Sequence, residues 1–398
     1  MSERGFGLSF LVSPVLGLLE AFSDLKRNSS LKILFWFCLC FGISFSVGTE
    51  RTKGSTDGIS MRADFEKYND DTEAEFMTHF EKFLEFDGSE QSFYIVTVSY
   101  LVGRFTDNYH IFFLVLALVF AFFQLKCLKY FVRERNYTNS VICILLVCLF
   151  LWNNIYNING ARFWTASWFA LLCAFKTFID NKPGYIAVSI FTVFFHISFF
   201  VFPLVLLLAY LLKNSDKPLL VIFCVSWLFS VFAEDLQVGF FKELNLPFMI
   251  QKKVDAYMEG EYSGKNDNGS GFYWVHQLFR TVLRHFIDIL ILLIALNRKN
   301  VKRKRVRAMI GLMLILATVA NFGMVMPVFG RRFFIVNYAL VAYTFLVSFG
   351  DRKYQMLVYM LPFVWFMNLF YLAKDLIYVL DLGFLLPPFV SFVRFALA

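Results

Sequence analysis

The stretch that decides the fold begins with Asn157-Ile-Asn-Gly-Ala-Arg162 and continues through an apolar run to the turn Lys182-Pro-Gly184. A second apolar run follows, with Phe194-Phe-His-Ile-Ser198 and then Pro203. The stretch places an arginine at the start of one predicted membrane helix and a histidine inside the next apolar run. Ionisable groups are costly inside a bilayer, so those found there are candidates for function. The rest of the chain is interpreted as a scaffold that holds such groups on one side of a membrane.

Apolar residues dominate the 398-residue chain, which is 58% hydrophobic and 17% charged, with a mean hydropathy of +0.60. Apolar runs of about 18 or more residues recur along the whole length, which indicates membrane spans. The sequence predicts a single, all-α polytopic integral membrane domain over residues 1–398. We expect about 11 or 12 transmembrane helices, some of them short or broken.

The formal charge of +8 reflects short basic blocks between the apolar runs rather than a face that binds nucleic acid. This distribution is typical of the positive-inside pattern, and the early cations Lys26, Arg27 and Lys32 place the N-terminus in the cytoplasm. The strongest block, Arg298 to Arg307, fixes a second cytoplasmic segment. The seven cysteines lie in or beside apolar runs and outside the long polar loops, so no disulfide framework is predicted.

Two long polar loops are expected outside the cell membrane, at 48–92 and 233–274. The short segment 92–102 is too short to cross and is interpreted as re-entrant or interfacial. The predicted spans are Leu31–Val47, Ile111–Phe131, Val141–Tyr156, Phe163–Phe178, Leu219–Phe232, Val275–Leu296, Met309–Val325, Phe333–Phe349, Leu357–Leu372 and a weaker Leu376–Phe392.

The segment Tyr185–Leu212 breaks the alternation of sides, because cations flank it at both ends. At ~1.5 Å per residue it reaches about 42 Å, too short for two full ~30 Å crossings. It is therefore either a pair of short, broken helices or one tilted span. Pro203 favours a break. Irregular backbone at membrane depth must be lined by protein or water, which predicts a cavity near His196.

Arg331 and Arg332 are predicted to lie in a tight outer turn, Phe-Gly-Arg-Arg, against the positive-inside bias. A guanidinium group binds phosphate through a planar, bidentate fork, so an anion site is one interpretation. Anchoring to lipid headgroups by snorkelling is the other. Arg162 is expected on the same face of the membrane as this pair.

A polar stripe runs along the predicted helix 275–296, where His276, Arg280, Arg284 and Asp288 recur every four residues. Arg284 and Asp288 are expected deep enough to need each other or another partner. The stripe is either an internal ion pair that locks packing or a polar wall for a charged headgroup.

The outer loops and the second apolar run add further candidates. Arg62, Asp64 and Tyr68 lie in the first loop and Lys253 and Tyr257 in the second. Mixed aromatic and polar surfaces suit sugar rings, but they also suit ordinary loop packing.

His196 could act as a general base near neutral pH, or it could be a core histidine bonded to a backbone carbonyl. The sequence contains no P-loop, Rossmann glycine fingerprint, HExxH or GxSxG motif. It therefore predicts no metal and no cofactor, and it disfavours nucleotide-driven pumps.

The order of these motifs resembles the EpsG family of Wzy-like polysaccharide polymerases. The resemblance rests on Asp64-Phe-Glu-Lys-Tyr68, on Arg162 with Ala166, on Phe194-Phe-His-Ile-Ser198, and on Lys253-Val-Asp-Ala-Tyr257, with Arg332 at a later outer position. Ser92-Phe-Tyr94 departs from the family, many of whose members carry an acidic residue and a proline there.

The resemblance implies a GT-C-like fold and chain extension of a surface polysaccharide at the outer face of the bacterial cytoplasmic membrane. The expected substrates are polyprenyl-pyrophosphate-linked repeat units, and a chain-length regulator and a flippase are expected partners. The residues and the resemblance together give the candidates for substrate binding: Arg162, Arg331, Arg332, Arg280, Arg284, Arg62, Tyr68, Lys253 and Tyr257. His196 or Asp64 is the candidate base. A lipid-linked oligosaccharide flippase and a membrane O-acyltransferase are the alternatives.

Overall fold

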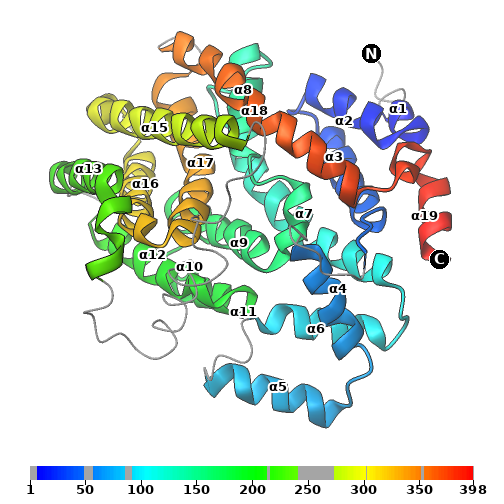
Figure 1. The fold of residues 1–398 in the computed structure, drawn as a ribbon. Coiled ribbons are helices and arrows are strands. Elements are labelled where there is room, and N and C mark those ends of the chain that lie inside the picture. The colour runs from blue at the N-terminus through cyan, green and yellow to red at the C-terminus, as the bar shows by residue number, and fades with distance from the viewer. Residues whose placement is uncertain are drawn as a thin grey trace.

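The structure is a computed structural model, and it describes residues 7–48, 57–85, 92–212, 216–240, 273–301, 303–350 and 354–397. Within these ranges the chain is helical (Figure 1), apart from turns and one isolated β-bridge between Phe45 and Leu380. That bridge joins the end of α3 to the end of α18, so the first and last long helices of the chain end side by side.

The first half of the described chain contains α1 (Leu8–Val12), α2 (Pro14–Ser23), α3 (Asn28–Ile43), α4 (Asp57–Tyr68), α5 (Glu73–Glu85), α6 (Phe93–Gly103), α7 (Tyr109–Val132), α8 (Val141–Phe150), η2 (Ile155–Gly160) and α9 (Ala161–Phe178). The second half contains α10 (Tyr185–Val188), η3 (Ser189–Phe191), α11 (Thr192–Phe195), η4 (Ile197–Phe200), α12 (Val201–Leu211), α13 (Asp216–Phe240), α15 (Tyr273–Asn297), η5 (Arg298–Asn300), α16 (Lys304–Phe322), η6 (Gly323–Val325), α17 (Pro327–Phe349), α18 (Gln355–Val379), η7 (Leu382–Leu385) and α19 (Pro388–Ala396).

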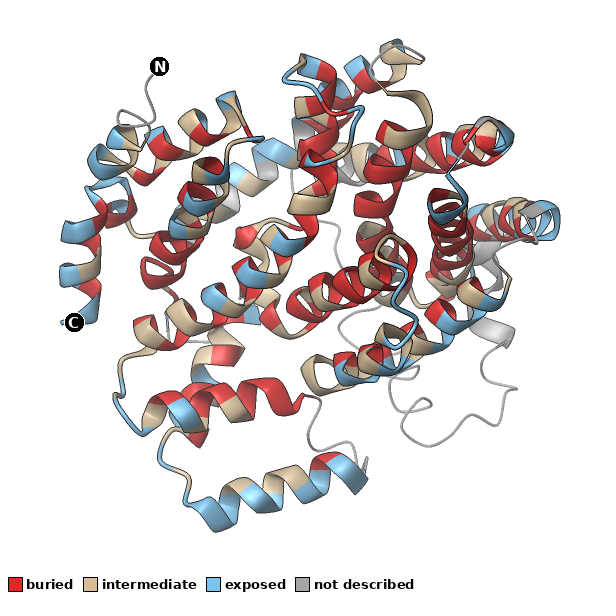
Figure 2. Ribbon diagram, turned by 180° about the vertical axis from the view of Figure 1, so that it is seen from behind, coloured by how far each residue is buried: buried red, intermediate tan, exposed pale blue. Residues whose placement is uncertain are grey.

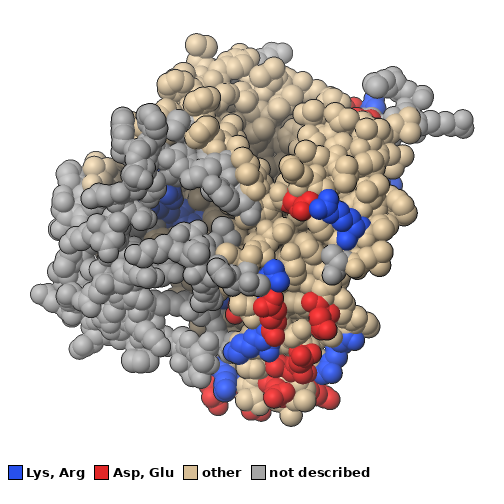
Figure 3. Space-filling view, turned by 45° about the vertical axis from the view of Figure 1, so that its right-hand side comes forward, with Lys and Arg blue, Asp and Glu red and all other residues tan. Residues whose placement is uncertain are grey.

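Four stretches are long and apolar enough to cross a membrane: α7, the stretch Val141–Phe178, and the segments Lys304–Val325 and Val328–Phe349. Seven shorter apolar helices of 10–17 residues accompany them in the described ranges. In Figure 3, charged side chains gather at the end that holds α4 to α6, and most of the remaining described surface of this face is uncharged. The predicted all-α polytopic membrane protein is confirmed.

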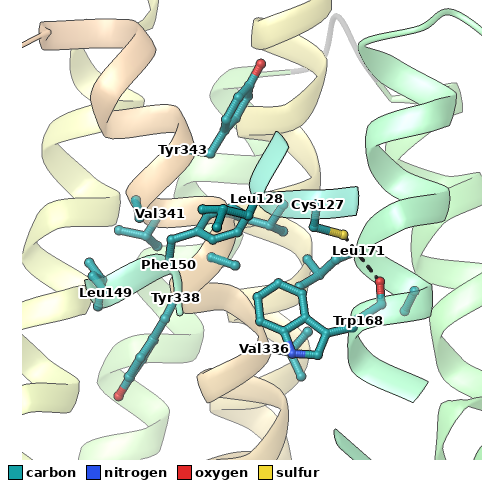
Figure 4. Packing of buried hydrophobic residues seen from close by; sticks show 14 of the residues in the cluster. Cys127, Leu128, Leu149, Phe150, Trp168, Leu171, Val336, Tyr338, Val341 and Tyr343 are labelled. Carbon is teal, nitrogen blue, oxygen red and sulfur yellow. Dashed lines mark hydrogen bonds between the residues drawn. The ribbon is translucent and has the colours of Figure 1, made fainter. Parts of the chain in front are cut away.

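The interior is packed with aromatic side chains, and the buried positions of the long helices face one another (Figure 2). Phe150 of α8 lies 5.6 Å from the ring of Trp168 in α9, measured between ring centroids (Figure 4). By the same measure, Phe175 of α9 lies 5.0 Å from Tyr343 in α17. Tilted and edge-on pairs of this kind are the arrangements that aromatic rings prefer. They hold α8, α9 and α17 together through the middle of the bundle.

Polar contacts gather four segments at one end of the bundle, which we call the basic end: 24–27, 133–140, 179–182 and 298–305. Asn139 donates to Asp24 at 3.2 Å, and Arg305 donates to the carbonyl of Ile179 at 2.9 Å. Arg303 pairs with Glu134 at 2.6 Å. The charge pattern had placed these segments on one common face, and they do lie together. The compartment that this end faces stays a prediction.

The predicted span Val141–Tyr156 is wrong in its second half, because α8 ends at Phe150 and the backbone then leaves the helix. Side chains form hydrogen bonds with the backbone of the irregular segment. The Asn153 carbonyl accepts from Gln124 Nε2 at 2.9 Å and from Trp168 Nε1 at 3.1 Å. The Asn153 amide in turn donates to Ser167 Oγ at 2.7 Å. At membrane depth such partners are what permits a break in a helix.

The segment Tyr185–Leu212 forms a pair of short helices, Tyr185–Phe195 and Ile197–Leu211. This is one of the two predicted alternatives for the segment. The break falls at His196, whose backbone is extended (φ −159°, ψ 125°). The prediction that Pro203 makes the break is wrong. Pro203 is the third residue of α12, in the first turn, where a missing N–H costs no helix hydrogen bond.

The predicted last span, Leu376–Phe392, is also wrong. Helix α18 continues to Val379, and Asp381 then accepts from the backbone N–H of Gly383 at 2.6 Å to begin η7. The Pro387-Pro388 pair ends η7 and starts the nine-residue α19, because proline fits the first turn of a helix and not its interior.

We expect Gln124→Leu to lower the stability of the folded protein by about 1–3 kcal/mol, because it removes one donor to the buried Asn153 carbonyl. Thr177→Val is the matched control: its hydroxyl is buried without a hydrogen-bond partner among the described residues, so its loss should be neutral or stabilising. The measurement is the melting temperature of the purified protein in one detergent. Equal losses in both variants would contradict the assigned role of Gln124.

Candidate functional site

The candidate site lies at the end of the bundle opposite the basic end. Here α4, the junction of η2 and α9, the break between α11 and η4, and the first turns of α17 meet. In Figure 1, α4 and α11 lie in the lower half of the view, away from α1 and α2. We call this region the site end, and the following contacts define it.

Asp57, the first residue of α4, ties the first outer loop to the site end. Its carboxylate lies 3.5 Å from the guanidinium of Arg332, and the next residue, Gly58, donates its N–H to Asn159 Oδ1 at 2.8 Å. The same carboxylate lies against Gly160, only 3.4 Å from where a Cβ would be, and Trp164 lies closer still at 3.1 Å. A glycine at 160 thus allows α4 to approach the start of α9.

Phe163 is the apolar centre of the site. The Arg332 guanidinium lies 5.5 Å from its ring centroid, in the range of a cation–π contact, and the His196 ring packs edge-on at 5.4 Å. Phe333 of α17 also contacts this ring at 5.5 Å. Three separate elements therefore place Arg332 and His196 around one aromatic side chain.

The side chain of His196 is held by a backbone group of the break between α11 and η4. Its Nδ1 accepts the backbone N–H of Ser198 at 3.1 Å, which caps η4. In the neutral imidazole one ring nitrogen accepts and the other carries the proton, so this bond fixes the proton on Nε2. In this conformation Nδ1 is used in the cap, so Nε2 is an N–H donor and the ring has no second basic nitrogen.

Three arginines lie at the start of α9 and in the second turn of α17 at the site end. Arg162 is the second residue of α9, and Arg331 and Arg332 lie in the second turn of α17. The predicted tight turn at 329–332 is therefore wrong, because the turn is η6 and the pair belongs to the helix. Asp57 pairs with Arg332, whereas no described carboxylate pairs with Arg162 or Arg331.

The stripe along α15 approaches the same helix, α17, from another side. Arg284 donates to Asn321 Oδ1 of α16 at 3.2 Å and lies 5.8 Å from the ring of Phe334. The charges of Arg280 and Arg284 both act on Tyr338 in α17. Both predicted arginines therefore act on the part of α17 that follows Arg331 and Arg332.

Asp288 lies one turn deeper and is completely buried. The charge of Arg284 and the amide of Asn321 act on its carboxylate, although neither carboxylate oxygen has a hydrogen-bond partner in the described part of the chain. His285 approaches to 3.9 Å, but its Nδ1 accepts the indole N–H of Trp227 at 3.1 Å and so carries no proton toward Asp288. Arg284 thus makes contacts that fit the predicted packing role of the stripe. It also adds positive charge beside α17, as the predicted headgroup wall requires.

The other predicted residues of the first outer loop have structural contacts. Arg62 donates to the carbonyl of Val47 at 2.7 Å, pairs with Glu66 and stacks on Tyr109 at 3.9 Å. These contacts tie α4 to the ends of α3 and α7. The hydroxyl of Tyr68 accepts from Lys67 at 2.9 Å, and its ring packs on a small cluster with α5 and α6.

Asp64 is half-buried on α4, two turns beyond Asp57. The predicted Lys253 and Tyr257 lie outside the described residues. Sequence analysis missed Asp57 and Phe163. Asp57 could have been found as the acidic residue that begins a helix in the first outer loop, while an additional phenylalanine among 53 gives no signal. Within the described ranges, no group of three or more His, Cys, Asp and Glu residues could hold a metal ion.

Fold and site together define a multi-pass helical membrane protein with a cationic site where broken and short helices meet at one end of the bundle. The EpsG family model matches residues 33–381, and the chain belongs to this family, which is one of Wzy-like polymerases. The match runs from α3 to the end of α18 and includes every element of the site. No curated protein and no solved structure matches the chain.

We expect Arg284→Leu to destabilise the protein by about 1–3 kcal/mol, because it removes the donor to Asn321 Oδ1 and the positive charge that acts on the buried Asp288 carboxylate. The double variant Arg284→Leu/Asp288→Leu should recover most of this loss. The exposed pair Arg394–Asp381 is the control, and Arg394→Leu should cost less than about 1 kcal/mol. Thermal unfolding in detergent measures all three. Failure of the double variant to recover would show that Asp288 is not what Arg284 compensates.

Proposed function

We propose that this protein is a polysaccharide polymerase whose site end binds the diphosphate of a lipid-linked glycan. The site end would then face the outer side of the cytoplasmic membrane, and the basic end the cytoplasm. The observation that carries the proposal is Arg332 at the ring of Phe163, paired with Asp57. Arg162 precedes Phe163 in α9 and Arg331 precedes Arg332 in α17, which brings two further arginines to the same helix ends. Membership of the EpsG family supports the same conclusion at the level of the reaction class.

The proposed reaction is a glycosyl transfer without a nucleotide. The bond between the anomeric carbon of the growing chain and its polyprenyl diphosphate breaks, and the diphosphate leaves with the bonding electrons. A hydroxyl at the non-reducing end of a second lipid-linked repeat unit forms the new glycosidic bond and gives up its proton. Two needs follow: stabilisation of the charge that develops on the leaving diphosphate, and an acceptor for the proton.

The arginines meet the first need. A diphosphate offers planar sets of oxygens that match the guanidinium fork, and the interaction is stronger beside apolar rings than in water. Phe163, Phe199 and Phe333 supply such rings, with centroids 4.9–5.5 Å apart. Arg280 and Arg284 would extend the same positive field along α15 toward the second substrate.

His196 fits the role of a hydrogen-bond donor better than that of a base. Its Nδ1 is already occupied by the Ser198 N–H, so the proton it can present is on Nε2. A donor beside the arginines would bind an oxygen of the diphosphate. The proton acceptor would then be a carboxylate of α4, either Asp64, as the sequence suggests, or Asp57, which contacts Arg332.

The aromatic core favours the polymerase over the flippase alternative. A carrier needs a polar path between both ends, whereas Phe150 and Trp168 pack together inside the bundle (Figure 4) and Phe175 is buried beside Phe150. No contact among the described residues specifically favours an acyltransferase.

We expect Arg332→Ala and Arg162→Ala to abolish long-chain polymer, and Arg332→Lys to retain only part of it, since lysine keeps the charge but loses the bidentate fork. Arg394→Ala is the matched control, because Arg394 lies in α19 outside the family match and pairs with Asp381. The measurement is the size profile of surface polysaccharide, with protein level checked by immunoblot. Normal chain lengths in both alanine variants would refute the proposal.

His196 variants separate a donor from a base. Glutamine can present an amide N–H near the position of Nε2, whereas asparagine can reproduce the cap to the Ser198 N–H but cannot reach as far. We therefore expect His196→Gln to keep measurable polymerisation and His196→Asn to lose it while remaining folded. Polymer formed per unit of protein is the readout. Loss of activity in the glutamine variant, with normal stability, would contradict the donor role and indicate that His196 acts as the base.

A further inference from the structure

We propose that a groove between α3 and α7 binds an anionic phospholipid of the leaflet at the basic end. These two helices pack side by side along much of their length (Figure 1). Near the first turns of α3 and the last turns of α7 they leave a cavity of about 260 Å³. Its wall includes three lysines, Lys32, Lys126 and Lys129, and three aromatic residues, Phe35, Trp36 and Phe122.

The positive charges of this groove have no counter-ion among the described residues of the protein. Lys32 comes from α3 and the other two lysines from α7, and no carboxylate lines the cavity. Elsewhere at the basic end, cations contact acids: Arg27 pairs with Asp24, Lys176 with Asp180 and Arg303 with Glu134. No such pair forms with the three groove lysines in the described part of the chain. Three lysines that line one cavity from two helices suit a phosphate.

The apolar part of the groove identifies the phosphate as that of a lipid. Trp36 and Phe122 are about half exposed, at 50% and 47%, and Lys126 lies 5.3 Å from the centroid of the Phe122 ring. Tryptophan is enriched at the level of lipid headgroups, where one end of the ring is apolar and the other is polar. Basic pockets between membrane helices at the cytoplasmic side are known to hold acidic headgroups. The geometry therefore fits a headgroup on the lysines and an acyl chain along the rings.

This lipid is distinct from the proposed polyprenyl diphosphate donor. The groove lies at the basic end, where Lys26, six residues before Lys32, lies over the ring of Tyr137 at 5.7 Å. The arginines of the proposed reaction lie at the opposite end of the bundle. Binding at the groove can thus be present or absent independently of the proposed function, and its test does not use polymer formation.

The test is a titration of the purified full chain in detergent with phosphatidylglycerol or phosphatidylcholine, followed by native mass spectrometry. We expect the anionic lipid to bind and the zwitterionic lipid to bind at least tenfold more weakly. Each lysine near an anionic headgroup contributes about fivefold, so Lys32→Gln/Lys126→Gln/Lys129→Gln should lose affinity on the order of 100-fold. The three single variants should each lose part of it, which keeps the test valid if the triple variant folds poorly.

The matched control removes three lysines from the same end but outside the groove: Lys182→Gln/Lys299→Gln/Lys304→Gln. It should leave the affinity for phosphatidylglycerol within about twofold, because its charges do not line the groove. An equal loss in this control would mean nonspecific attraction and would overturn the proposal. Displacement of the lipid by a tenfold excess of glycerol 3-phosphate would also overturn it, since the site would then take a soluble phosphate.

Discussion

The hydrogen bonds to the Asn153 carbonyl are the constraint on which the rest of the structure depends. Helix α8 ends at Phe150, inside the bundle. The chain can leave the helix there because Gln124 and Trp168 donate to the Asn153 carbonyl and Ser167 Oγ accepts from the Asn153 amide. The released segment then reaches η2 and sets where α9 begins. Since Arg162 and Phe163 are the second and third residues of α9, the position of the proposed site follows from how this break is satisfied.

The site end differs from the basic end in how its charge is balanced. At the basic end, arginines and lysines contact acids at 2.6–3.0 Å, as in Arg303–Glu134 and Lys176–Asp180, so their fields are largely cancelled. At the junction of α4, α9 and α17, the pair that Arg332 forms with Asp57 is longer, 3.5 Å, and the Asp57 side chain is 57% exposed. An exposed acid is displaced at little cost. The arrangement holds the arginines in place without a ligand and leaves their charge available to an incoming anion.

The sequence predicted the membrane class and the gathering of basic segments, and it gave a pair of short helices at 185–212 as one of two alternatives. These features follow from hydropathy, charge and length, which are local properties of the sequence. It misplaced features that depend on tertiary partners. Val141–Tyr156 reads as one span, since nothing in its apolar run shows that Gln124 will satisfy a break at Asn153. His196 gives no hint from composition that it, and not Pro203, will interrupt the helix. Arg162, Arg332 and His196 were found from their types, whereas Asp57 and Phe163 are defined only by contacts across the fold.

Helix α17 connects the two ends and limits how the site can move. Its 23 residues span about 35 Å, with Arg331 and Arg332 in the second turn and Tyr343 near the other end. Tyr343 donates to Glu134 at 2.6 Å, and Arg303 holds the same carboxylate. A shift of Arg332 along the helix axis would have to break this network and slide Phe333 past Phe163 and Phe199. The arginines are therefore fixed in position before a substrate arrives, as electrostatic stabilisation of a leaving group requires. In the proposed reaction, any motion that admits two large lipid-linked glycans would have to come from the short elements around the arginines, α4 and the α11–η4 break.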